Sequence, residues 1–212
     1  RYCFRRHFPY ETSPRTLEAW RPAIQQVAED DSVEEVILSG GDPLLASDKY
    51  LKKCLEDLAA IPHLKILRIH SRLPIVLPER ITTDFLDSLT ATRLQAVMVT
   101  HSNHANELDD SVRAAMDRLR ERKISLLNQA VLLKGVNDTV EALSHLSYRL
   151  FACGILPYYL HVLDKVQGAA HFAVDEQQAK QLWIALRETL PGYLVPRLVY
   201  EQAGAKSKLA LL

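Results

Sequence analysis

The sequence has little cysteine, no surplus of either charge and no long apolar run, and each of these absences excludes a class of protein. Its three cysteines, Cys3, Cys54 and Cys153, are odd in number and far apart, which argues against a disulfide framework and favours a reducing compartment. The 26 basic side chains are balanced by 26 acidic ones, so no electrostatic footprint for nucleic acid or a membrane surface is present. No apolar run reaches the ~20 residues that span a bilayer. We therefore expect one cytoplasmic globular domain over residues 1–212.

Short apolar runs alternate with amphipathic helical stripes from one end of the chain to the other. One such stripe consists of Leu51, Cys54, Leu55 and Leu58, and Ser47 precedes it as a helix N-cap. The predicted strands comprise residues 36–38, 66–69, 96–99, 125–127, 158–162 and 194–199. Regular alternation of short strands with helices predicts a parallel sheet with right-handed crossovers.

The number of predicted strands narrows the architecture. Six strands are fewer than the eight of a closed (β/α)8 barrel, which typically needs ~250 residues. The prediction is therefore an α/β fold built as a partial (β/α)6-type barrel, whose first strand is expected to lie before Arg1. A doubly wound open sheet is the structural alternative, because periodicity alone does not separate the two.

Polar and ionisable residues follow almost every predicted strand. The strand-end residues are Gly40, Gly41 and Asp42, then His70, Ser71 and Arg72, then His101, Asn128 and Gln129, and last Asp164 and Glu201. Parallel α/β folds build their active sites at the C-terminal ends of the strands. The repeated occurrence of such residues at matching positions therefore predicts a site at that edge.

Two of these loops allow more than one interpretation. In residues 39–42 the paired glycines let the backbone approach a ligand closely, but a tight strand-to-helix turn needs glycine as well. His101 and His104 are three residues apart, yet no carboxylate or cysteine completes a convincing metal site, and a capping loop is equally supported. Asn137 and Asp138 are expected to cap the helix that follows them.

Arginines at the start of the chain and two acidic residues later in it are suited to hold a carboxylate and an ammonium group. Arg5 and Arg6 lie beside Cys3, and a guanidinium is a natural bidentate clamp for a carboxylate, although a solvated basic pair is the more common use of such residues. Asp164 and Glu201 each follow an apolar strand. Two carboxylates that converge on a barrel mouth can hold an ammonium group.

Several long stretches together resemble one family. They are the Cys-Phe-Arg-Arg-His run at residues 3–7, Leu-Ser-Gly-Gly-Asp-Pro-Leu at 38–44, Leu-Asn-Gln at 127–129, Gly-Val-Asn-Asp at 135–138, and Pro-Tyr-Tyr-Leu-His-Val-Leu-Asp-Lys-Val-Gln-Gly at 157–168. In these stretches the chain resembles the radical SAM enzymes, and among them the lysine 2,3-aminomutases. The run at 157–168 is most similar to the branch that makes (R)-β-lysine for modification of elongation factor P.

The resemblance implies roles for the cofactor-binding residues. Cys3 matches the third cysteine of the Cys-x3-Cys-x2-Cys loop that holds a [4Fe–4S] cluster, and the first two cysteines are expected before Arg1, so the chain is expected to lack its amino-terminal region. The positions that match those beside S-adenosylmethionine are Ser39, Gly40, Gly41, Asp42, His101 and Gln129. The resemblance also implies that a lysine in the C-terminal segment 194–212 holds pyridoxal 5′-phosphate. Lys208 lies seven residues after Glu201 and follows a serine, as in the family, and Lys206 is the alternative.

The resemblance further implies the substrate and the reaction. Arg5 matches the arginine that binds the substrate α-carboxylate, while Asp164 and Glu201 match the acidic pair that holds the lysine ε-amino group. The implied reaction is the conversion of L-α-lysine to (R)-β-lysine by 2,3-amino migration. The implied functional partners are elongation factor P and its lysyl-transferring enzyme.

Two departures from the family pattern keep other functions open. The region before Arg1, which in the family supplies two cluster cysteines and the basic residues for the phosphate group, is not in the sequence. The glycine-rich run before the cofactor lysine is reduced to Ala203-Gly204-Ala205-Lys206-Ser207. A glutamate or other amino-acid 2,3-aminomutase is one alternative, though it would need a cation in place of the acidic pair. A non-catalytic α/β ligand-binding domain is the other.

Overall fold

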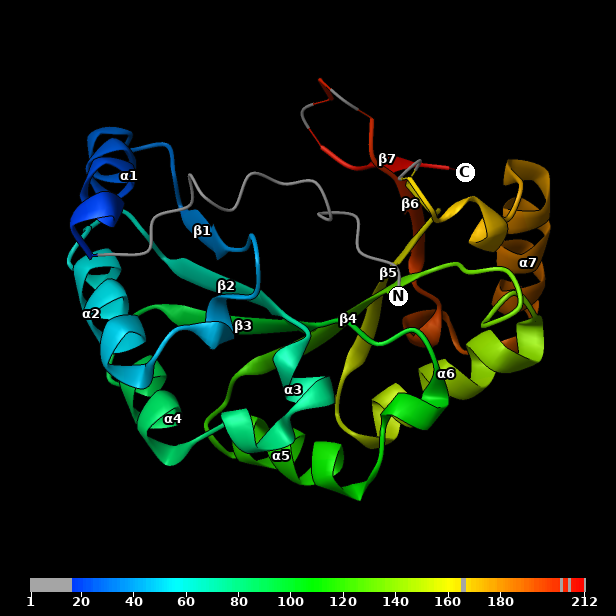
Figure 1. The fold of residues 1–212 in the computed structure, drawn as a ribbon, viewed down its shortest axis with the longest axis horizontal. Coiled ribbons are helices and arrows are strands. Elements are labelled where there is room, and N and C mark those ends of the chain that lie inside the picture. Colours follow the sequence, from blue (N-terminus) through cyan, green and yellow to red (C-terminus); the bar gives the residue numbers. More distant parts are fainter. Residues whose placement is uncertain (1–16, 165–166, 203, 206, 212) are drawn as a thin grey trace.

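The computed structural model describes residues 17–164, 167–202, 204–205 and 207–211 and contains one seven-stranded sheet. The strands are β1 (Glu35–Leu38), β2 (Ile66–Ser71), β3 (Gln95–Thr100), β4 (Ser125–Val131), β5 (Leu156–His161), β6 (Arg197–Tyr200) and β7 (Leu209–Ala210). Neighbouring strands from β1 to β6 pair in parallel, and β7 pairs antiparallel with β6. The sheet is curled, as Figure 1 shows.

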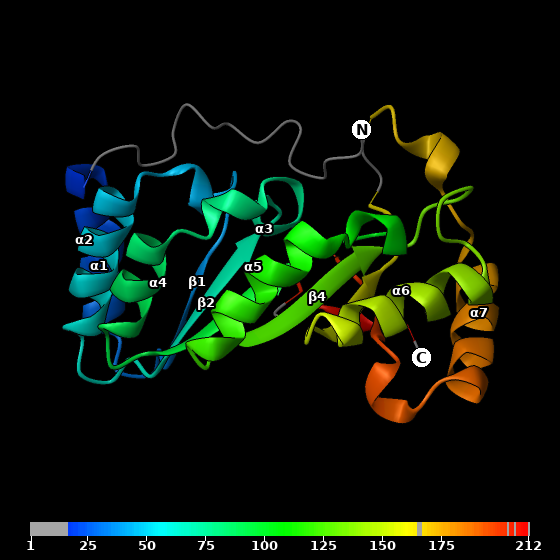
Figure 2. The same ribbon diagram turned by 90° about the horizontal axis from the view of Figure 1, so that it is seen from below.

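The strand order distinguishes the two predicted architectures. Each strand pairs with the strands next to it in sequence, without the reversal of order that defines a doubly wound sheet. The main helices are α1 (Leu17–Glu29), α2 (Asp48–Ala59), α4 (Thr83–Thr90), α5 (Asp110–Glu121), α6 (Val140–Ala152) and α7 (Glu176–Thr189). These helices lie along the convex side of the curled sheet (Figures 1 and 2). The prediction of a partial barrel is therefore confirmed, and the doubly wound alternative is wrong.

Buried and accessible side chains alternate along the strands, so one face of the sheet belongs to the core under the helices and the other is the concave inner face. In β2 the buried residues Leu67, Ile69 and Ser71 alternate with the more accessible Arg68 and His70. Because successive side chains of a strand point to opposite faces, the buried set packs under the helices and the other set lines the concave side. β4 alternates in the same way. The concave face is thus the surface on which polar side chains of different strands can meet.

Helix stripes and caps mostly follow the sequence patterns. The predicted stripe of α2 is buried, and Ser47 Oγ accepts a hydrogen bond from Tyr50 N at 3.3 Å. The prediction that Asn137 and Asp138 cap α6 is wrong, because Thr139 is the N-cap and accepts from Ala142 N at 3.2 Å. The Asn137 amide is used instead for contacts across the sheet edge.

The strands differ from the predicted ranges where polar residues continue the pairing. β4 extends to Val131, so Asn128 and Gln129 lie inside the strand and pair with β5. The segment before β6 forms a short 3-10 helix at Gly192–Leu194, and β6 begins only at Arg197. The two-residue strand β7 was not predicted.

Shorter helices complete the fold: α3 (Leu73–Val76), η2 (Pro43–Leu45), η3 (Pro78–Arg80), η4 (Ala105–Glu107) and η5 (Ala170–Phe172). Within the described part of the chain, no helix has the length and apolar character to cross a membrane.

Candidate active site at the carboxyl edge of the sheet

The glycine turn after β1 has a backbone conformation that depends on glycine. Gly40 and Gly41 have φ angles of 89° and 56°, in the left-handed region where an L side chain is strained. The Asp42 carboxylate then accepts four hydrogen bonds. Its Oδ1 atom accepts from Leu44 N at 3.1 Å and Ser71 Oγ at 2.7 Å.

The second oxygen of Asp42 joins this turn to the end of β2. Asp42 Oδ2 accepts from Arg72 N at 2.7 Å and from Leu73 N at 3.2 Å. Four donors occupy the lone pairs that one carboxylate offers, so Asp42 is held by the protein itself. The side chain therefore fixes the shape of the glycine turn relative to the next strand end.

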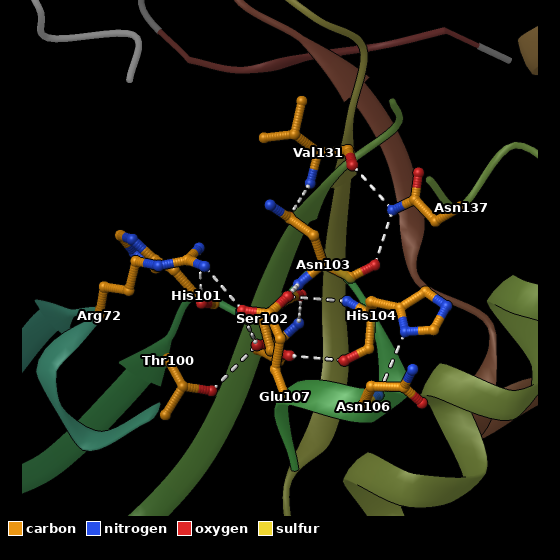
Figure 3. A network of polar contacts seen from close by, with 11 residues as sticks. Arg72, Thr100, His101, Ser102, Asn103, His104, Asn106, Glu107, Val131 and Asn137 are labelled. Atoms are coloured by element: carbon orange, nitrogen blue, oxygen red, sulfur yellow. Dashed lines mark hydrogen bonds and ion pairs between the residues drawn. The ribbon is translucent and has the colours of Figure 1, made fainter. Parts of the chain in front are cut away.

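A ring of polar contacts shapes the loop after β3 (Figure 3). Glu107 Oε1 accepts from the backbone N–H groups of Asn103 and His104 at 2.7 and 2.9 Å. Glu107 Oε2 forms an ion pair with Arg72 Nη2 at 2.7 Å, and Arg72 Nη1 donates to His101 O at 3.3 Å. His104 Nδ1 accepts from Asn106 N at 3.2 Å. The capping interpretation of His104 is therefore confirmed.

Two asparagines connect this loop to β4. Asn103 Oδ1 accepts from Val131 N at 2.8 Å, and Asn137 Nδ2 donates to Asn103 O at 2.8 Å and to Val131 O at 2.9 Å (Figure 3). Asn128 is buried, and its amide exchanges two hydrogen bonds with the Ser102 backbone. The sequence patterns did not assign these roles to Arg72, Glu107 or the asparagines. The only signal for Arg72 and Asn128 was polarity at a strand end, Asn137 was predicted as a helix cap, and Glu107 was not singled out.

His101 and Gln129 meet on the concave side of the sheet. Gln129 Nε2 lies 2.9 Å from His101 Nε2, and because an amide nitrogen only donates, the imidazole nitrogen accepts. The His70 ring lies edge-on to the His101 ring, with the centroids 5.9 Å apart. Gln129 Oε1 is buried and has no hydrogen-bond partner among the described residues. A buried amide oxygen in that condition is suited to accept a hydrogen bond from a ligand.

Lys208 enters the same concave face from the other end of the sheet. Its Nζ atom lies 3.0 Å from Glu201 Oε1, 3.3 Å from His161 Nε2 and 5.3 Å above the centroid of the Tyr159 ring. The Lys208 side chain is 27% exposed and borders a cavity of about 200 Å³ that Tyr159 and Arg197 also line. A partly buried lysine beside an open cavity can react with the aldehyde of a bound cofactor.

The antiparallel strand β7 accounts for the position of this lysine. Val199 pairs with Ala210 and Tyr200 with Leu209, so the chain turns back along β6 just after Lys208. Glu201 follows β6 directly, which places the two charged residues together although seven positions separate them. Lys206, the alternative cofactor lysine, lies outside the described residues.

The predicted acidic pair follows two hydrogen-bonded strands. Asp164 comes after β5 and Glu201 after β6, and Val162 N donates to Val199 O at 2.9 Å between those strands. Asp164 is half-buried, whereas the Glu201 side chain is 52% exposed and pairs with Lys208. The other predicted ligand-binding residues, Cys3 and Arg5, lie outside the described part of the chain.

His161 is an inward-facing histidine to which the sequence analysis assigned no role. Its residue is 7% exposed, and burial lowers the pKa of the imidazole to about 4, with Lys208 and His101 lowering it further and Glu201 opposing them. The imidazole is therefore neutral near pH 7. The signal that could have found it is its place in the conspicuous run at residues 157–168.

The fold places the chain in a known structural class. It superposes on SuiB from Streptococcus suis bound to S-adenosylmethionine, with a TM-score of 0.62 and 14% identity over 87% of this chain and 43% of that one. It also superposes on a radical SAM methyltransferase from Sphaerobacter thermophilus, with a TM-score of 0.58 and 15% identity over 88% of this chain and 55% of that one. The chain therefore has the partial-barrel fold of radical SAM enzymes.

Sequence comparison identifies the relatives within that class. The chain is 53% identical over 208 residues to an L-lysine 2,3-aminomutase from Haemophilus influenzae and 51% identical over 211 residues to that of Escherichia coli K12. It is 35% identical over 213 residues to the L-lysine 2,3-aminomutase of Clostridium subterminale. No protein-family model matches. The chain is thus homologous to the L-lysine 2,3-aminomutases, which confirms the resemblance seen in the sequence. These matches include 98–100% of this chain. The chain spans 62% of the length of the first two relatives and 51% of the length of the third.

Proposed function

We propose that the protein containing this chain is a radical SAM lysine 2,3-aminomutase that converts L-α-lysine to (R)-β-lysine. The observation that supports it most is the meeting of Lys208, Glu201 and His161 on the concave face that also holds the His101–Gln129 pair. A reactive amine and a polar ligand pocket on one face are what a two-cofactor rearrangement requires. The homology to proteins named L-lysine 2,3-aminomutase supports the same conclusion.

The residues at the carboxyl ends of β1, β3 and β4 fit S-adenosylmethionine. The left-handed turn at Gly40 and Gly41 brings backbone close to a ligand, and Asp42 holds that turn in place. In the proposal the backbone of Ser39 and the two glycines binds the methionine end. His101 and Gln129 are proposed to lie beside it, with Gln129 Oε1, which has no partner in the described part of the chain, as a hydrogen-bond acceptor.

Lys208 and Cys3 are proposed to hold the other two cofactors. Lys208 would bind pyridoxal 5′-phosphate through its amine, and Cys3 would be one thiolate ligand of a [4Fe–4S] cluster. When bound, these groups and S-adenosylmethionine supply the radical and the electron delocalisation for the amino migration. The protein's own side chains orient the reacting groups and keep water away from them.

Charge complementarity favours lysine as the substrate. Arg5 is proposed to bind the α-carboxylate, and Asp164 and Glu201 the ε-ammonium. Glu201 already accepts a hydrogen bond from an ammonium group in this structure, that of Lys208. We further propose that the reaction takes place in the cytoplasm and that its product serves the modification of elongation factor P by a lysyl-transferring enzyme.

A combined activity and labelling experiment tests the proposal. The full-length protein, reconstituted without oxygen with iron, sulfide, S-adenosylmethionine and pyridoxal 5′-phosphate, should convert L-lysine to β-lysine, measured by mass spectrometry. Borohydride reduction should fix the cofactor on the peptide that contains Lys208. Lys208→Ala should abolish both signals, because among the described residues Lys208 is the lysine that contacts Glu201 and His161, and Lys206→Ala should keep them.

Lys180→Ala is the matched control, since Lys180 lies on α7 and pairs with Glu176 on the same helix. Loss of the label in Lys206→Ala with retention in Lys208→Ala would transfer the role to Lys206. Absence of both β-lysine and label in the wild-type protein would contradict the proposed function.

A further inference from the structure

His161 has a contact that the proposed reaction does not by itself explain. It lies at the end of β5, is 7% exposed, and places Nε2 3.3 Å from Lys208 Nζ. Glu201 Oε1 lies 3.0 Å from the same nitrogen, and the Tyr159 ring lies below it at 5.3 Å. Lys208 is therefore surrounded by two acceptors and one aromatic face, of which His161 and Tyr159 belong to β5 and Glu201 follows β6.

The chemistry of the two partners fixes the direction of the hydrogen bond. A lysine ammonium has only donors, so His161 Nε2 must accept, and the ring proton is then on Nδ1. A histidine in its charged form could not accept, but burial and the nearby Lys208 and His101 keep this ring neutral near pH 7. His161 is thus a neutral acceptor directed at the lysine nitrogen.

We propose that His161 is a positioning residue for Lys208 which, together with Glu201, aims the nitrogen lone pair at the cofactor aldehyde. This inference depends on the proposed function, because it assumes that Lys208 reacts with pyridoxal 5′-phosphate. The ammonium must lose its third proton to react, and the neutral amine that remains has two hydrogens and one lone pair in a tetrahedral arrangement. Because the His161 proton is on Nδ1, its Nε2 has no proton to donate and still accepts from the amine. When one hydrogen is donated to His161 and the other to Glu201, the direction of the lone pair is determined.

The reaction that benefits is the condensation of an amine with an aldehyde. The Lys208 lone pair forms the new bond to the aldehyde carbon, the carbon–oxygen double bond breaks, and a carbon–nitrogen double bond replaces it. The two amine protons and the aldehyde oxygen leave together as water, so no oxidant or reductant is needed. Holding the nucleophile in the attacking orientation lowers the entropic part of the barrier.

A purely structural role for His161 makes a different prediction. Its ring contacts the Tyr159 ring edge-on, with the centroids 5.7 Å apart, and an aromatic ring without a nitrogen would preserve that packing. His161→Phe should therefore keep the fold but lose the acceptor. His161→Gln should supply an amide oxygen close to the position of Nε2 and so restore it.

The test measures attachment of the cofactor and not turnover. The wild-type protein and both variants are mixed with pyridoxal 5′-phosphate, quenched with borohydride at successive times, and the modified Lys208 peptide is quantified by mass spectrometry. We expect attachment to slow about tenfold in His161→Phe, the equivalent of one lost hydrogen bond, and to recover to within about threefold in His161→Gln. His145→Phe, at an exposed position on α6, should behave as the wild type does.

Attachment in His161→Phe at the wild-type rate would overturn the inference while leaving the proposed function intact. Wild-type protein that acquires no label on Lys208 would instead refute the proposed function. If the phenylalanine variant does not fold, the imidazole nitrogen shifts of the wild-type protein decide by NMR. A ring with Nδ1 protonated and Nε2 bare at pH 7 supports the inference, and a proton on Nε2 overturns it.

Discussion

Two carboxylates at the ends of β5 and β6 differ in their surroundings, and this difference matters for the proposed substrate. Asp164 is half-buried, while the Glu201 side chain is half-exposed and already pairs with Lys208. Removing the partner of a buried charge costs more free energy than removing the partner of an exposed charge, because water cannot solvate the charge that is left. The two acids should therefore contribute unequally to binding of the lysine ε-ammonium.

Asp164→Asn should lower kcat/KM for L-lysine about a hundredfold, and Glu201→Gln should lower it less, because solvent screens the exposed carboxylate. Binding of S-adenosylmethionine should not change in either variant. Steady-state kinetics and calorimetric titration measure the two quantities. Glu188→Gln, an exposed acid on α7, is the control. Wild-type kinetics in both variants would show that the ammonium site lies elsewhere.

At the scale of elements, the ends of four consecutive strands are joined by side chains instead of by the backbone ladder. Asp42 connects β1 to the end of β2, Arg72 and Glu107 connect β2 to the loop after β3, and Asn103 connects that loop to β4. Loops at the carboxyl edge have no ladder of their own, so such contacts determine their shape. Glu107 is central because it accepts from two backbone N–H groups and one guanidinium.

Glu107→Ala should release the loop after β3 without unfolding the sheet. The Asn103 and His104 N–H groups and Arg72 would lose their acceptor, at a cost of about 1–3 kcal/mol in the free energy of unfolding. Hydrogen exchange followed by mass spectrometry should show faster exchange in residues 101–107. Glu121→Ala, at the exposed end of α5, should not alter this peptide. Unchanged exchange in Glu107→Ala would show that the ring does not hold the loop.

At the scale of the whole molecule, the buried neutral histidine couples stability to pH. The pKa of His161 is lowered to about 4 in the folded protein from 6.5 in the unfolded chain. Between these values the unfolded state binds more protons, so stability is full above pH 6.5 and falls as the pH falls toward 4. Each unit of difference corresponds to about 1.4 kcal/mol, which gives a loss of about 3 kcal/mol from this group.

His161→Phe should remove this part of the acid sensitivity. Urea unfolding at pH 7 and pH 4.5 should show a smaller loss of stability in the variant than in the wild type, by about 2–3 kcal/mol. The other titrating groups are shared by the two proteins, so their difference isolates His161. His145→Phe should titrate like the wild type. Equal losses in wild type and His161→Phe would mean that the buried ring does become protonated in the folded state.

Local sequence patterns were sufficient for much of the architecture. The stripe of α2, the Ser47 cap and the six parallel strands follow from side-chain periodicity, which depends on residues close together in the chain. The residues at the strand ends were also visible, because parallel strands bring their carboxyl ends to one edge. Homology was visible in the motifs themselves, since long runs such as residues 157–168 are specific to a family.

What the sequence alone determined is therefore the order of the elements and the edge at which the site lies. Only the tertiary structure decided that Asp42 is bound by the next strand end, that Glu107 closes a ring with Arg72, and that Lys208 meets His161. The Arg72–Glu107 pair is separated by 35 residues and the Lys208–His161 pair by 47. No local periodicity encodes a contact at that separation, because it depends on how the strands pair and curl. Lys208 precedes β7, whose position is set by its pairing with β6.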